Sequence, residues 1–126
     1  MVYDYDLFVL EASLSTTAAP LTYYGQNQPG TTTPWTVPTP GSYVQKVHKL
    51  VITNTGTSTA TVTLTAVSTV SSNPTLTLLE ISVPSGATET YSEDDFDIIL
   101  PESYYLQGVI SAGSGYAFAQ AYFVKG

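Results

Sequence analysis

The chain has 126 residues, 43% of them hydrophobic, and its 10 acidic and 3 basic side chains give a formal net charge of −7. All three basic residues are lysines, which excludes the clustered basic surface of proteins that bind nucleic acids or anionic membranes. The absence of cysteine excludes disulfide scaffolds and thiolate sites, and the length predicts a single domain, residues 1–126.

Period-two alternation dominates the sequence, and the spacing of an amphipathic helix is missing. We therefore expect an all-β protein with about eight strands separated by turn residues. In chain order, the expected strands cover residues 2–11, 43–53, 59–67, 75–83, 87–91, 96–100, 104–111 and 115–124. The first of them places Tyr3, Tyr5, Leu7 and Val9 on one face.

The segment of residues 12–42 interrupts this pattern, because it is rich in proline and threonine and alternates little. It also holds Trp35 and the pair Tyr23 and Tyr24, and disordered linkers rarely contain such aromatic residues. The segment is either a long loop packed over its own domain or an extended arm that docks on a neighbouring subunit. Tyrosine and tryptophan are residue types that stabilise interfaces.

The next two strands, 43–53 and 59–67, are separated by the turn residues 54–57 and are expected to form a hairpin. In the strand 59–67, small and branched apolar residues alternate with threonine, which is typical of a strand with one buried and one solvent-exposed face. The inward face of 43–53 stays undecided, because residues 50–52 are consecutively apolar. The last two strands are expected to form another hairpin, around residues 113–115.

About eight short strands with this patterning favour two antiparallel sheets packed face to face. The expected fold is therefore a jelly-roll-like β-sandwich with a long Pro/Thr-rich loop or arm.

Catalytic and metal-binding signals are weak. His48 is the single histidine, and no nucleophile motif accompanies it, so we expect a polar residue on a strand and no enzyme. The acidic run of residues 93–97 predicts a solvated turn. Two alternatives are a weak Ca²⁺ site at Asp94, Asp95 and Asp97 and a contact with Lys46 and Lys49 of another subunit. We assign no catalytic residue and no cofactor.

The order of the turns carries a family resemblance. The run of residues 51–64, VITNTGTSTATVTL, precedes a Pro84-Ser85-Gly86 turn, then the sequence DIILPE at 97–102 and a Gly-Ser-Gly turn. Over residues 47–124 the chain resembles small β-sandwich virion proteins of tailed bacteriophages and related viruses, of the head-decoration, neck or tail accessory type. One departure is Ser103, where the pattern usually places a glycine after the proline.

The resemblance implies a non-enzymatic structural protein of the virion. Such a protein would assemble in the host cytoplasm without a signal peptide, as a homo-oligomer (commonly a trimer) or on a major capsid or tail protein. Nucleic acids and membranes are not expected as partners, because the chain is acidic and has few basic residues. The interface candidates are Tyr3, Tyr5, Tyr23, Tyr24, Trp35, Lys46 and Lys49.

Two other functions stay open. One is a carbohydrate- or receptor-binding module that recognises a glycan through an aromatic platform formed by Tyr23, Tyr24, Trp35 or the pair Tyr104 and Tyr105. The other is a filament or surface-layer subunit that donates residues 2–11 as a strand to the next copy.

Overall fold

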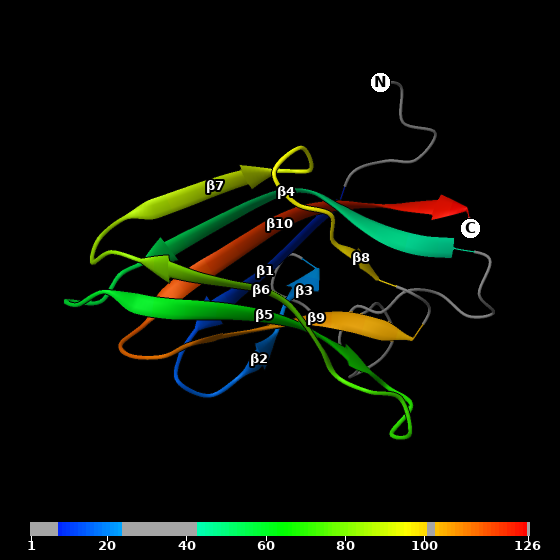
Figure 1. Ribbon diagram of the computed structural model, residues 1–126, viewed down its shortest axis with the longest axis horizontal. Coiled ribbons are helices and arrows are strands. Elements are labelled where there is room, and N and C mark those ends of the chain that lie inside the picture. The colour runs from blue at the N-terminus through cyan, green and yellow to red at the C-terminus, as the bar shows by residue number, and fades with distance from the viewer. Residues whose placement is uncertain (1–7, 24–42, 101–102, 126) are drawn as a thin grey trace.

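The computed structural model describes residues 8–23, 43–100 and 103–125, and Figure 1 shows that this part of the chain is built from strands and loops. Each of the eight expected strands has a counterpart, and two short strands are added between the first and second of them. The ten strands are β1 (Phe8–Leu14), β2 (Ala19–Pro20), β3 (Thr22–Tyr23), β4 (Tyr43–Asn54), β5 (Ala60–Ser68), β6 (Leu76–Val83), β7 (Thr88–Ser92), β8 (Ile99–Leu100), β9 (Tyr104–Ile110) and β10 (Gly115–Lys125).

The strands form two antiparallel sheets, as expected for a sandwich. Sheet A has the order β3-β1-β10-β4-β7, with β8 also paired to β4, and sheet B has the order β2-β9-β5-β6. Without the short strands β3 and β8, the two orders are those of an eight-stranded jelly roll. In the part of the chain that is described, no helix is long and apolar enough to cross a membrane.

Both hairpin predictions are wrong. β4 lies in sheet A and β5 in sheet B, and β9 and β10 are divided between the sheets in the same way. The turns between them are therefore arches that cross from one sheet to the other, and they lie side by side, since the Thr55 amide donates to the Ser114 carbonyl at 3.0 Å. Alternation shows which face of a strand is buried but not which sheet the strand joins.

The first strand is shifted relative to the prediction. Of residues 2–11, residues 2–7 lie outside the described part of the chain, and the strand continues to Leu14. Its inward residues are Leu10 and Leu14, so Val9 lies on the outer face. Because β1 is paired with both β10 and β3, residues 8–11 are already part of their own sheet, and the proposal that 2–11 as a whole is donated to another copy is wrong for them.

The segment 12–42 is not a loop or arm along its whole length. Its first part, residues 12–23, ends β1 and supplies β2 to sheet B and β3 to sheet A. Leu14 and Leu21 are fully buried, so this part belongs to the core. Residues 24–42, with Tyr24 and Trp35, lie outside the described residues, as do Tyr3 and Tyr5.

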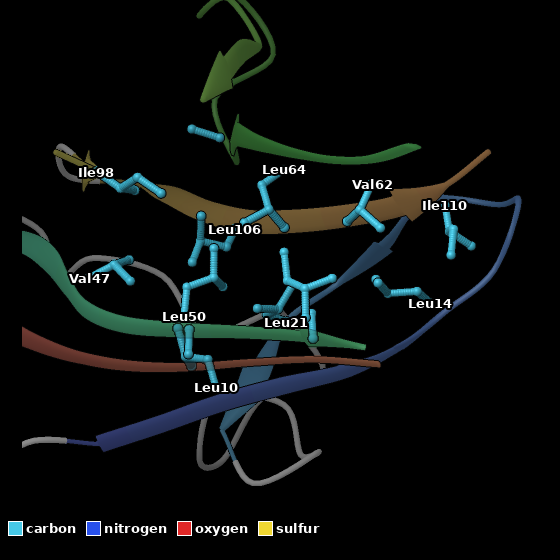
Figure 2. Packing of buried hydrophobic residues seen from close by; sticks show 14 of the residues in the cluster. Leu10, Leu14, Leu21, Val47, Leu50, Val62, Leu64, Ile98, Leu106 and Ile110 are labelled. Atoms are coloured by element: carbon cyan, nitrogen blue, oxygen red, sulfur yellow. The ribbon is translucent and has the colours of Figure 1, made fainter. Parts of the chain in front are cut away.

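The core lies between the two sheets. Figure 2 shows leucine, valine and isoleucine side chains of both layers meeting there, among them Leu10 and Leu50 of sheet A and Leu64 and Leu106 of sheet B. The alternation in β5 is confirmed, because Val62, Leu64 and their even-numbered neighbours are buried while the threonines between them are partly exposed. This packing makes the outer faces of both sheets available for contacts.

Candidate interaction surface

A β-bulge at His48 determines which side chains of β4 face outward. Lys49 pairs with Gln120 of β10, whereas Val47 pairs with Ala121, so β4 has one residue more than β10 at this point. The inward positions therefore change from odd to even numbers, with Val47 buried before the bulge and Leu50 after it. Of the apolar run at residues 50–52, which left the inward face undecided, Leu50 and Ile52 are buried and Val51 faces outward.

The same bulge places Lys46 and Lys49 on one face of sheet A. Without the extra residue, two side chains three positions apart would point to opposite faces of a strand. Lys46 alternates with the buried Gln45 and Val47 and is partly exposed, and Lys49 is exposed. Two of the interface candidates are thus brought to a common outer surface.

The outer face of sheet A carries two neighbouring apolar side chains at its centre, between Glu11 of β1 and Thr90 of β7. Phe118 of β10 pairs with Val51 of β4, and Val51 pairs with Thr90 of β7. Phe118 and Val51 are partly exposed, although they lie on the outer side of the sheet. Together with Val9, Glu11, Ser13, Lys49, Thr53, Thr88, Ser92, Tyr116 and Gln120, these residues form what we call the outer face of sheet A.

Tyr116 is the exposed aromatic residue of this face, with 37% of its surface accessible. Its hydroxyl donates a hydrogen bond to Oε2 of Glu11 on the neighbouring strand β1. Burial, this hydrogen bond and the negative charge of Glu11 together raise the pKa of Tyr116 to about 12. The phenol is therefore held neutral and oriented along the sheet.

A cluster of His48, Glu93 and Tyr122 lies beside the bulge, and no sequence pattern predicted it. Nδ1 of His48 lies 3.1 Å from Oε1 of Glu93, and the Tyr122 hydroxyl donates to Oε2 of the same carboxylate at 3.0 Å. The Glu93 amide also donates to the His48 carbonyl at 2.9 Å. Because both carboxylate oxygens are engaged, the cluster anchors the turn after β7 to β4 and β10.

The acidic turn of residues 93–97 leads from β7 to β8. Asp95 closes it, since its Oδ2 accepts a hydrogen bond from the Ser92 amide at 2.9 Å. Asp94 and Asp97 are exposed. Among the residues that the structure describes, no three histidine, aspartate or glutamate side chains come together in a way that could hold a metal ion.

The other aromatic candidates fall in different places. Tyr23 is in the edge strand β3. Tyr104 is buried, with 6% of its surface accessible, and donates to the Pro74 carbonyl at 2.9 Å, so it cannot be part of an exposed sugar platform. Tyr105 is partly exposed on the outer side of sheet B. Phe118, Val51 and Tyr116 were not singled out from the sequence, because large apolar residues are expected on the inward face of a strand. In β10 the inward positions are instead the alanines Ala117, Ala119 and Ala121.

Comparisons with known proteins give a structural likeness but no family. No protein-family model and no curated protein matches the chain. A solved structure from the work described as "Bacillus endospore appendages form a novel family of disulfide-linked pili" superposes with a TM-score of 0.49 and 13% sequence identity, covering 96% of this chain and 86% of that chain. This chain contains no cysteine, and a likeness at this level carries no argument about function.

Proposed function

We propose that the chain is a non-enzymatic structural protein that assembles with copies of itself through the outer face of sheet A. The observation that carries this proposal is the row in which Phe118 pairs with Val51 and Val51 with Thr90. These positions are on the side of the sheet away from the core, where an antiparallel sheet facing water normally alternates to polar and charged side chains.

The composition of this face suits an interface. The cores of protein interfaces are depleted in charged side chains and enriched in aromatic ones, with polar groups at the rim. Phe118 and Tyr116 supply the aromatic area, and Lys49 and Glu11 are the charged residues near it. Covering the hydroxyls of the surrounding threonine and serine side chains costs much less than covering charges.

We further propose that the assembly is part of a virion. The support is the resemblance of residues 47–124 to head-decoration, neck and tail accessory proteins, together with a jelly-roll topology, which is common among viral capsid domains. Assembly in the host cytoplasm and docking on a major capsid or tail protein belong to the same proposal. The jelly roll is a fold with many functions, so this part rests on analogy.

A carbohydrate-binding module is the second candidate function. The exposed ring of Tyr116, oriented by the Glu11 carboxylate, is the kind of aromatic platform with a polar neighbour on which sugars stack. Jelly rolls also occur among lectins. This candidate requires binding by a monomer, whereas assembly requires the same face to be covered by protein.

The experiment is a concentration series of the purified chain in sedimentation velocity. Assembly predicts an oligomer, and the double variant Val51→Thr/Phe118→Thr should shift it towards monomer because the apolar area is lost. Val109→Thr is the matched control, since Val109 is a partly exposed residue on the outer side of sheet B. A chain that stays monomeric at all concentrations and binds glycans through Tyr116 would overturn assembly in favour of the carbohydrate module.

A further inference from the structure

The two outward lysines of β4 form the basic patch of the described chain. Lys46 and Lys49 are two of the three basic residues of a protein with net charge −7. The bulge at His48 brings both to the outer side of sheet A. Within the described ranges, the ion pair that forms at this point joins His48 and Glu93, and neither lysine takes part in one. Both ammonium groups are therefore available to a partner.

An acidic patch lies next to the lysines on the same edge of the sheet. β7 pairs with β4 from residue 49 onward and β8 pairs with residues 45 and 46, so the turn between them passes β4 at His48. Figure 1 shows this turn, in yellow, beside β4. Asp94 and Asp97 are exposed there and have no role in closing the turn, unlike Asp95.

An apolar side chain connects the two patches with the outer face of sheet A. Ile99 of β8 pairs with Lys46, and 43% of its surface is accessible. The edge thus presents positive charge, negative charge and apolar area within a few residues of one another. A surface that contains both signs of charge side by side can be complementary to itself when two copies meet about a two-fold axis.

We propose that two copies of the chain associate through this edge, with Lys46 and Lys49 of each copy facing Asp94 and Asp97 of the other. The inference rests on the proposed self-assembly and names the partner and the contact. A second copy is the occupant that the charges favour, because this edge carries both signs of charge and is therefore complementary to itself. The net charge of −7 makes two copies repel each other over the rest of their surfaces, so opposite charges are needed where they meet. Since such a two-fold contact joins two copies only, larger assemblies require the outer face of sheet A as well.

The salt dependence of association distinguishes this charged contact from a contact made by apolar area alone. Screening removes the general repulsion between two acidic chains, so an apolar contact becomes tighter as salt is added. A contact between opposite charges becomes weaker under the same change. We expect the dissociation constant of the pair to rise when NaCl is raised from about 0.05 M to about 0.5 M.

The decisive experiment exchanges the charges between two variants. Lys46→Glu/Lys49→Glu and Asp94→Lys/Asp97→Lys should each associate with themselves about tenfold more weakly than the wild type, since like charges then meet across the contact. A 1:1 mixture should restore association, and native mass spectrometry should identify the pair as mixed by its mass. The rescue also shows that both variants are folded.

Glu80→Lys provides the control for net charge, because Glu80 is exposed on β6 of sheet B. It should neither weaken self-association nor rescue Lys46→Glu/Lys49→Glu when the two are mixed. If the wild type associates and the charge variants associate as tightly, the two-fold contact is wrong and the assembly through sheet A stands. If the wild type is monomeric throughout, both proposals are overturned.

Discussion

Nδ1 of His48 lies 3.1 Å from Oε1 of Glu93 at the point where β4 has one residue more than β10. The contact connects the bulge, which sets the outward positions of β4, to the turn that carries the exposed aspartates. The surface proposed for assembly therefore depends on a residue that the sequence suggested was an ordinary polar strand residue.

Removing the Glu93 carboxylate should loosen this arrangement. Glu93→Ala deletes the acceptor of both His48 and the buried Tyr122 hydroxyl, and we expect a loss of about 1–3 kcal/mol in the free energy of unfolding. Urea denaturation of the wild type and the variant measures this difference in the free energy of unfolding. Asp94→Ala, one position later and exposed, should change stability by less than about 0.5 kcal/mol. Equal effects of the two substitutions would show that the cluster contributes nothing.

Asn54 connects the two sheets through its side chain. Its Nδ2 donates to the carbonyls of Ser58 and Val83, at 2.8 and 2.9 Å, and its Oδ1 accepts from the Gly56 amide. Asn54→Ala should cost about 2–4 kcal/mol, because buried backbone groups lose their partner. Asn73→Ala is the matched control, since the Asn73 side chain bonds at the surface, and a loss of the same size there would contradict this role.

Ser103 has a backbone conformation that favours glycine. Its φ of 69° lies in the left-handed region, which a side chain with a Cβ disfavours. Ser103→Gly should therefore stabilise the fold by roughly 0.5–1 kcal/mol. Gly86 has a φ of 71° and open space around it, so a side chain there meets no neighbour but strains the backbone. Gly86→Ala should therefore lower the free energy of unfolding by a similar amount. Thermal unfolding measures both, and a destabilised Ser103→Gly would contradict the argument.

The ionisation of Tyr116 should be visible at high pH. Its pKa is raised to about 12 from the ordinary tyrosine value of 10.0, so the folded state holds the proton more tightly than the unfolded state. The resulting stabilisation is fully present below pH 10 and is lost as the pH rises through about 12.

The absorbance of the wild type is titrated with pH, and the curve of the Tyr116→Phe variant is subtracted from it. The difference reports the ionisation of the Tyr116 phenol. We expect the difference to titrate near pH 12, and Glu11→Gln should lower that value only in part, because burial is the largest cause of the shift. A difference curve that titrates near pH 10 would contradict the burial and the hydrogen bond.

The sequence predicted the regular strands well because their alternation is determined locally. β5 is the clearest example, since its four buried residues are apolar and the three residues between them are threonines. The same pattern cannot distinguish a hairpin from an arch between sheets, which is why the partners of β4 and β10 were wrong. β2 and β3 have two residues each and exist because of the strands beside them, so no period could show them.

The candidate site was predictable only in part. Lys46 and Lys49 were selected from the sequence, but their common face follows from the bulge, which requires the pairing with β10. The parity change between Val47 and Leu50 was the available signal, because a single strand cannot bury both without an extra residue. Glu93 and Tyr122 lie 45 and 74 positions after His48, at separations no local pattern covers.

Single cysteines test the central claim most directly, because the chain contains none of its own. Thr90→Cys places a thiol on the outer side of sheet A, and Ser82→Cys places one on the outer side of sheet B, both at exposed positions of edge strands. On going from dilute to concentrated protein, alkylation of the Thr90→Cys variant should slow while that of the Ser82→Cys variant stays unchanged. Unchanged alkylation of the Thr90→Cys variant in a sample shown to be oligomeric would contradict assembly through sheet A.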